Sequence, residues 1–179
     1  MAMPNYSYPP DPMANEPGWK DITNRAGPIV KKFLAKATEL FGPPTNSMPV
    51  RVTELKSAPQ STFHNGIAYI RVGQGVSANP DDEHDLKGQI AHEIVHVLFW
   101  EKDVKVTMLE EGLCSYFAIN YGGEHVPRPE DREQRRYYEA YELVTKLLEK
   151  CPVIIRQLRV PPCSIDKIAA DFERLARKF

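Results

Sequence analysis

The chain of 179 residues has few cysteines, only three, and none of them forms a C-x-x-C pair. This number is too small for the disulfide framework that stabilises small secreted domains, and it favours reduced thiols in a cytoplasmic protein. A single disulfide between Cys151 and Cys163, with Cys114 buried as a free thiol, is the alternative that the spacing leaves open. At this length one domain can bury enough apolar surface to fold without such a bond.

Long apolar runs and an excess of charge are also lacking. No stretch reaches the roughly 18 apolar residues of a membrane-spanning helix, and residues 1–10 contain no basic region followed by an apolar run, as a secretory signal would. The 23 Lys and Arg residues nearly balance the 24 Asp and Glu residues. We therefore expect no membrane or nucleic-acid partner, because either would need a basic surface or an apolar anchor.

Residues 1–20 carry five prolines among polar residues and show little apolar periodicity. This composition predicts an extended or disordered N-terminal arm. Beyond it, the hydrophobic pattern predicts a helix over 28–41 and a strand over 50–55. Asn65 and Gly66 are typical of a type I′ turn and predict a β-hairpin whose second strand covers 67–72.

The second half of the chain shows mainly helical periodicity. Asn79 is a suitable N-cap for a helix reaching Trp100, whose second half is apolar on nearly every side and therefore predicted to cross the core. Thr107 and Glu110 form a T-x-x-E capping box that predicts the start of the next helix. The remaining predicted elements are this helix to about Tyr121, a charged helix over 129–150, a short strand or loop over 153–160, and a final helix over 164–179.

An H-E-x-x-H motif lies inside the apolar helix, at His92, Glu93 and His96. Side chains four residues apart share one helix face, so both imidazoles can bind a single ion. Glu93 lies about 100° around the helix from His92, beside such an ion rather than on it. An apolar helix normally excludes these three polar side chains, because burying them without partners costs several kcal/mol. The motif therefore predicts a metal site, and the alternative is a set of core residues satisfied by local hydrogen bonds.

A second motif follows a dozen residues later, where Glu111, Gly112, Ser115 and Tyr116 spell E-G-x-x-S-Y. Together the two motifs, over residues 92–116, resemble those of the gluzincin metallopeptidases, the group of thermolysin-like enzymes and related aminopeptidases. The resemblance implies that Glu111 is the third zinc ligand, and the capping box separately gives Glu110 a structural role. An exchange of roles between these two acids is the alternative.

The resemblance also implies the fold and the chemistry. The expected fold class is α+β, a zincin-like (gluzincin) domain with a small twisted sheet and an active-site helix above a mainly helical lower lobe. Residues 21–101 would form the upper lobe and 102–179 the lower one. One Zn²⁺ per chain would leave a coordination position for water, with Glu93 as general base in peptide-bond hydrolysis. No G-x-M-E-N segment is present, so the expected activity is that of an endopeptidase acting on peptides or proteins.

Contacts to the substrate are less defined by the sequence. The candidates for stabilising the oxyanion are Tyr116, Tyr121, His125, Tyr137 and Tyr138, and the sequence does not choose among them. In this family, substrates pair with an edge strand, and 67–72, including Ala68 and Tyr69, is the candidate strand, with an ordinary core hairpin as the alternative.

Two other functions stay open at this point. The chain could be a zinc-bearing binding or regulatory module that keeps a peptidase-like fold without turnover. It could also be a latent enzyme whose N-terminal arm lies in the cleft. A Cys–His nucleophile formed by Cys114 and His92 is disfavoured, since the matching family position is Ala and a small apolar packing role suffices.

Overall fold

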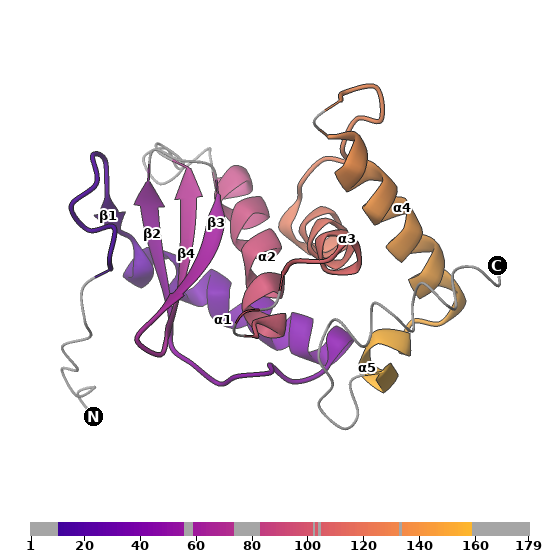
Figure 1. The fold of residues 1–179 in the computed structure, drawn as a ribbon, viewed down its shortest axis with the longest axis horizontal. Helices are drawn as coiled ribbons and strands as arrows, with labels where there is room; N and C mark the ends of the chain where they lie inside the picture. Colours follow the sequence, from indigo (N-terminus) through magenta and orange to yellow (C-terminus); the bar gives the residue numbers. More distant parts are fainter. Residues whose placement is uncertain are drawn as a thin grey trace.

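The computed structural model describes residues 11–55, 59–73, 83–101, 103, 105–132 and 134–158. In these ranges the fold is α+β, with a four-stranded sheet at one end and helices at the other (Figure 1). The helices are α1 (Thr23–Phe41), α2 (Glu83–Phe99), α3 (Met108–Phe117), α4 (Arg135–Lys150) and α5 (Ile154–Leu158), and a π-helical turn (Ala118–Gly122) continues α3. No helix in the described ranges has the length and apolar character needed to cross a membrane.

The sheet contains β1 (Lys20–Asp21), β2 (Val50–Leu55), β3 (Gln60–His64) and β4 (Ile67–Gly73) in the order β1-β2-β4-β3. β4 pairs in parallel with β2 and antiparallel with β3. The prediction that residues 67–72 form the edge strand is therefore wrong, because β4 lies between two strands. β3 occupies the edge of the sheet on the side of α2.

The predicted hairpin is confirmed. Asn65 and Gly66 connect β3 to β4 with φ values of 48° and 76°. Both central residues of a type I′ turn need positive φ, which Asn tolerates and Gly adopts without steric cost. The turn holds the edge strand β3 antiparallel to β4, with Phe63 opposite Ala68.

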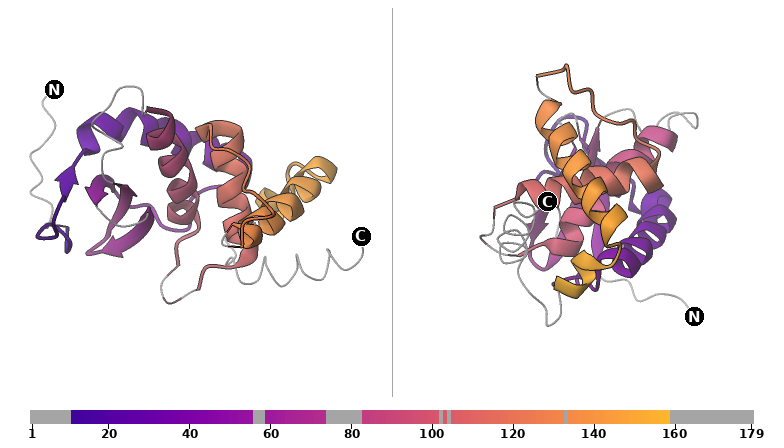
Figure 2. Two further views of the ribbon diagram at one scale, coloured as in Figure 1. Left: turned by 90° about the horizontal axis from the view of Figure 1, so that it is seen from above. Right: turned by 90° about the vertical axis from the view of Figure 1, so that its right-hand side faces the viewer.

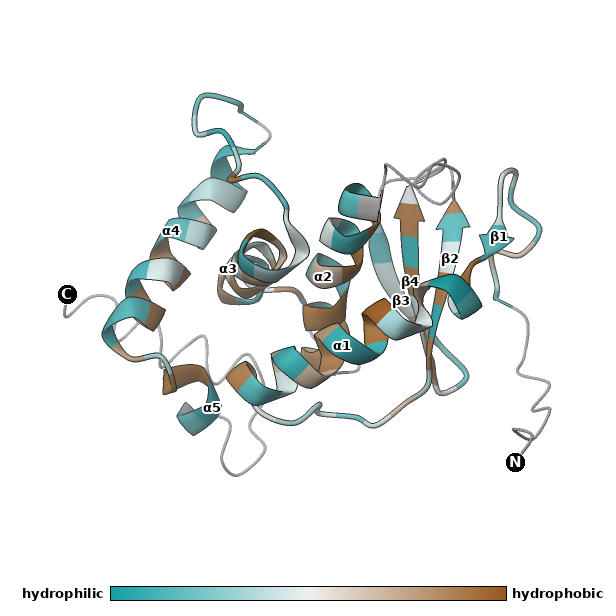
Figure 3. Cartoon of the chain, turned by 180° about the vertical axis from the view of Figure 1, so that it is seen from behind, coloured by the Kyte–Doolittle hydropathy of each residue, from teal (hydrophilic) through white to brown (hydrophobic). Residues whose placement is uncertain are grey.

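The two faces of the sheet have different roles. Ala68, Ile70 and Val72 of β4 belong to the apolar core shared with α1 and α2, and Figure 3 shows the alternation of apolar and polar residues along this strand. Tyr69 and Arg71 alternate with them and so point to the opposite face. Helices α1 and α2 therefore cover one face only, and α3 and α4 lie beyond α2 (Figure 2).

Residues 11–19 fold over the outer face in a series of turns instead of forming the predicted extended or disordered arm, of which residues 1–10 lie outside the described ranges. Asp11 is 3% exposed and forms an ion pair of 2.7 Å with Arg71. Its carboxylate also accepts hydrogen bonds from the Met13 amide, the Trp19 indole and the Thr53 hydroxyl. This network holds the segment on the sheet face opposite the helices.

Close contacts through glycine fix the helices around α2. A Cβ added to Gly112 of α3 would lie 2.5 Å from the carbonyl oxygen of Ala140 on α4. A Cβ added to Gly122 would lie 2.6 Å from the Cβ of Ala91 on α2. Both distances are too short for any side chain, so glycine allows these backbones to approach.

Three further expectations differ from the structure or lie outside it. Helix α1 begins at Thr23 rather than at Pro28. Pro28 has no N–H to donate to the carbonyl one turn earlier, but it lies on the exposed side of the helix, where water can bind that carbonyl instead. Residues 154–158 form helix α5 rather than a strand. The predicted cap at Asn79 and the final helix over 164–179 lie outside the described residues, as does Cys163, while Cys114 and Cys151 are free thiols.

Candidate metal centre

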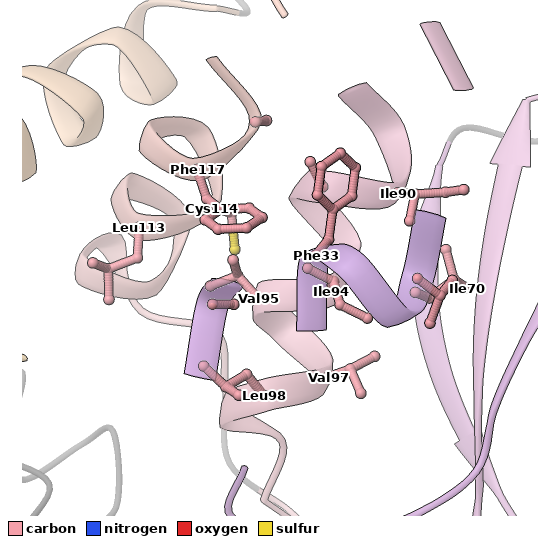
Figure 4. Packing of buried hydrophobic residues seen from close by; sticks show 14 of the residues in the cluster. Phe33, Ile70, Ile90, Ile94, Val95, Val97, Leu98, Leu113, Cys114 and Phe117 are labelled. Carbon is pink, nitrogen blue, oxygen red and sulfur yellow. The ribbon is translucent and has the colours of Figure 1, made fainter. Parts of the chain in front are cut away.

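Helix α2 carries the H-E-x-x-H motif at the boundary between the core and a cavity. The rings of His92 and His96 lie 5.3 Å apart, as expected for residues separated by one helical turn. The imidazoles are 20% and 12% exposed, and Glu93 is 4% exposed. Ile90, Ile94 and Leu98 of the same helix lie in the apolar core (Figure 4). The apolar side of α2 therefore anchors the helix and leaves the motif facing the cavity.

Glu110 orients the second histidine. Its carboxylate lies 2.7 Å from Nδ1 of His96 and is 7% exposed. The Thr107 hydroxyl accepts a hydrogen bond from the Glu110 amide, so the predicted N-cap is confirmed, but the Glu110 side chain binds His96 instead of closing the capping box. A carboxylate on Nδ1 fixes the ring and leaves Nε2 as the nitrogen that faces outward.

Glu111 faces both imidazoles from α3. Its Oε2 lies 3.5 Å from Nε2 of His92 and 4.0 Å from Nε2 of His96. This oxygen is buried and has no hydrogen-bond partner in the structure. The two acids thus occupy different positions, since Glu110 contacts the far nitrogen of His96 and Glu111 faces the near nitrogens of both histidines.

The charges of the site are shifted by burial and by one another. Burial raises the pKa of Glu93, although the neighbouring histidines oppose the shift. Burial opposes the charged forms of His96 and Glu111 too, but their partners outweigh it, so that Glu110 raises the pKa of His96 and the two imidazoles lower the pKa of Glu111. The arrangement therefore keeps Glu111 ionised and makes Glu93 the more basic carboxylate.

Cys114 lies closer to the imidazoles than the sequence suggests. One donor atom each of His92, His96 and Cys114 lie within 4.8 Å of one another, so these residues could hold a metal ion. Cys114 is fully buried, next to Val95 in the apolar cluster (Figure 4), and burial raises the pKa of its thiol well above the usual value. The sequence alone predicts only a packing role for Cys114. Its position one turn after Glu110 and Glu111 is the signal that could have placed it near the metal site.

Two cavities meet at the motif. The first, of about 390 Å³, extends from the histidines to Phe63 and Trp100. The second, of about 320 Å³, extends to Glu124 and His125. The residues that line both are Pro59, His92, Glu93 and Tyr137. His92 and Glu93 thus border both cavities, whereas His96 lines the first.

The structure separates the predicted substrate contacts into two groups. Tyr137 lines both cavities, and His125 lines the second. Tyr116 instead lines a different cavity between α1 and α4, so it does not reach the histidines. Ala68 and Tyr69 are fully buried in the central strand β4, where no substrate can pair with them. The edge strand on this side of the sheet is β3, and its residues Ser61 and Phe63 line the first cavity.

Comparison of the chain with protein families, with curated proteins and with solved structures gives no match. Any function must therefore be argued from the residues themselves.

Proposed function

We propose that the protein is a zinc-dependent endopeptidase in which His92, His96 and Glu111 hold the metal. The observation that carries the proposal is the position of Glu111 Oε2, buried without a partner and 3.5 Å and 4.0 Å from the two Nε2 atoms. Ligands around tetrahedral zinc, each about 2.0–2.1 Å from the ion, lie roughly 3.3 Å apart. The two distances from Oε2 to the Nε2 atoms are longer than a hydrogen bond between a carboxylate and an imidazole. They are close to the separation between two ligands of the same zinc ion.

Zinc, when bound, supplies a Lewis acid that polarises the scissile carbonyl and acidifies water. Glu93 lies beside the histidines, and its second carboxylate oxygen is buried without a hydrogen-bond partner. It accepts the proton of the attacking water and delivers it to the leaving amine. Burial keeps this carboxylate basic enough for both transfers.

Tyr137 is the best candidate for the oxyanion donor among the residues predicted for this role. It lines both cavities, whereas Tyr116 lies elsewhere. Arg136 donates a hydrogen bond of 2.8 Å to the Tyr137 hydroxyl oxygen. The Tyr137 proton is therefore free to be donated to a developing negative charge.

The edge strand and the paired cavities support internal cleavage of a peptide. β3 has one side free of strand partners among the described residues, so an extended peptide can pair with its backbone. Because His92 and Glu93 line both cavities, residues before and after the scissile bond can be accommodated in separate cavities. An exopeptidase would need a closed end that recognises a terminus.

The test combines metal analysis with one conservative variant. Purified wild-type protein should contain about one zinc ion per chain and cleave members of a broad peptide library. Glu93→Gln should keep the zinc and lose about 10²- to 10⁴-fold in kcat/KM, the usual contribution of a general base. A wild-type protein that does not bind zinc after reconstitution would contradict the proposal.

A closed, non-catalytic zinc site is the second candidate, and the position of Cys114 favours it. If Cys114 joins His92, His96 and Glu111, four protein ligands surround the ion and none of its positions stays open, as in structural zinc sites. Cobalt substitution separates the two. A thiolate-to-cobalt charge-transfer band that disappears in Cys114→Ser indicates the closed site, and its absence from the wild type indicates the open, catalytic one.

A further inference from the structure

The far end of the first cavity combines a stacked aromatic pair with a glutamate that has one buried oxygen without a hydrogen-bond partner. Phe63 of β3 and Trp100, which follows α2, stack with ring centroids 4.3 Å apart and an angle of 23° between the rings. Glu101 lines the same cavity next to them. One of its carboxylate oxygens is buried and has no hydrogen-bond partner in the structure.

The other acids of this cavity already have neighbours. Glu110 binds His96, and Glu93 and Glu111 lie beside the imidazoles. Glu101 differs from them because no histidine interacts with it among the contacts of the described residues. Among the described residues that line the cavity are four glutamates and no Lys or Arg, and its two histidines lie beside Glu93, Glu110 and Glu111 rather than Glu101. A buried carboxylate without a partner is costly, and a cation from outside the chain would relieve that cost.

The distance from the metal centre fits a side chain of the same substrate. His92, His96 and Trp100 follow one another at four-residue spacing, so Trp100 lies about 6 Å along the helix direction from His96. An extended peptide covers this distance in about two residues. A residue one or two positions from the scissile bond can therefore place its side chain against Trp100 and Glu101.

We infer that Phe63, Trp100 and Glu101 form a subsite for a basic side chain of the peptide substrate, Arg above all. A guanidinium group can stack on the aromatic pair and form charge-assisted hydrogen bonds with Glu101. The subsite rests on the proposed peptidase function, and it selects peptides with a positive charge close to the cleaved bond.

The test uses matched peptides that differ only in charge. Peptides carrying Arg at successive positions are compared with the same peptides carrying citrulline, which has nearly the same shape and no charge. Binding is measured with the zinc-loaded Glu93→Gln protein, which holds peptides without cleaving them. We expect Arg at one position to bind about 10- to 100-fold more tightly than citrulline, and this preference should weaken with added salt.

A second substitution tests the assigned carboxylate. Glu101→Gln, introduced into the same protein, should abolish the preference for Arg, whereas Glu16→Gln, at an exposed glutamate outside both cavities, should leave it intact. The melting temperature and zinc content of each variant show whether it folds as the parent does. If Glu101→Gln fails to fold, Trp100→Phe provides a second variant, and it should reduce the preference.

The outcomes separate the subsite from the peptidase function. Equal binding of Arg and citrulline peptides, or a preference that survives Glu101→Gln, overturns the subsite even if the wild type cleaves peptides. A Glu101-dependent preference for Arg supports the subsite even if the wild type cleaves nothing, and only the proposed peptidase function would then fail.

Discussion

Two clusters of buried polar side chains lie on opposite sides of the sheet, and they differ in how their charges are satisfied. On the outer face, both oxygens of the Asp11 carboxylate accept hydrogen bonds, and Arg71 provides its counter-charge. On the helical side, Glu93 and Glu111 each keep one buried oxygen without a partner. In the first cluster the charges of Asp11 and Arg71 balance each other, although Nε of Arg71 also has no hydrogen-bond partner. In the second cluster three glutamates face two histidines, so the carboxylates outnumber their possible counter-charges. This difference fits a structural role for the first cluster and the proposed metal binding for the second.

The largest expected effect is a loss of stability when the ion pair between Asp11 and Arg71 is broken. Asp11→Asn leaves the buried Arg71 guanidinium unpaired and should lower the free energy of unfolding by about 3–5 kcal/mol. Urea denaturation at neutral pH measures it. The matched control is Asp21→Asn, which weakens the more exposed ion pair with Arg51 and should cost less than about 1 kcal/mol. Equal losses in both variants would mean that Asp11 is not a structural anchor.

The same variant predicts a pH dependence. Burial opposes the charged form of Asp11, but its hydrogen bonds and Arg71 outweigh burial and lower its pKa. The stabilisation by the carboxylate is therefore complete above the unfolded pKa of about 3.9 and is lost as the pH falls through the lower folded value. The difference in unfolding free energy between wild type and Asp11→Asn should shrink below about pH 4. A constant difference at all pH values would contradict this assignment.

Substitution in the cluster around Glu93 and Glu111 should weaken metal binding without lowering the stability of the fold. Glu111→Gln removes a proposed ligand, so zinc affinity should fall by more than about 100-fold, beyond the 10- to 100-fold loss typical of an outer-shell partner. Competition with a chelator measures the affinity. Without zinc, the variant should be at least as stable as the wild type, because it removes a charge whose buried oxygen has no hydrogen-bond partner. Unchanged zinc affinity would remove Glu111 from the ligand set.

A smaller effect is expected at the residue that orients His96. Glu110→Ala should reduce zinc affinity by about 10- to 100-fold, since it frees the imidazole whose Nδ1 it now binds. Thr107→Ala removes the N-cap of the same helix and should cost about 1 kcal/mol of stability with little change in zinc affinity. If the two variants behave alike in both measurements, Glu110 acts only on the helix.

The smallest effect tests whether the clusters are independent. Zinc at 100 times its Kd should stabilise the folded protein by about 2.7 kcal/mol. This increment should be the same in Asp11→Asn within about 0.5 kcal/mol, because distant sites without shared partners contribute additively. Thermal or chemical unfolding with and without zinc gives the two increments. A smaller increment in the variant would show that the outer face and the metal centre are coupled.

The features predicted correctly from the sequence depend on local geometry. Four-residue spacing on a helix brings His92 and His96 together, and Asn65 with Gly66 determines the hairpin turn. The errors concern contacts that are distant in sequence. β2 pairs with β4 rather than with β3, the next strand in sequence. This pairing places Ala68 and Tyr69 in the centre of the sheet instead of at the expected edge.

Other features of the fold and site were missed for similar reasons. The counter-charge of Asp11 lies sixty residues away at Arg71, so composition alone indicated a disordered arm. The sequence predicts a local capping-box contact for the Glu110 side chain. In the structure this side chain instead contacts His96, fourteen residues away. Side-chain choices of this kind depend on how α2 and α3 pack, which periodicity does not specify. The part of the arm at 11–19 also lies on the far face of the sheet, so it cannot block the cleft.

The contact between Gly122 and Ala91 has a mechanical consequence for the metal centre. Ala91 immediately precedes His92, so this contact limits rotation of α2 about its own axis. An imidazole about 6 Å from that axis would move by roughly 1 Å if the helix rolled by about 10°. Displacements of this size can cost an enzyme about 100-fold in rate. A methyl group at position 122 would thus push against Ala91, rotate α2 and displace His92 and His96 without contacting either histidine.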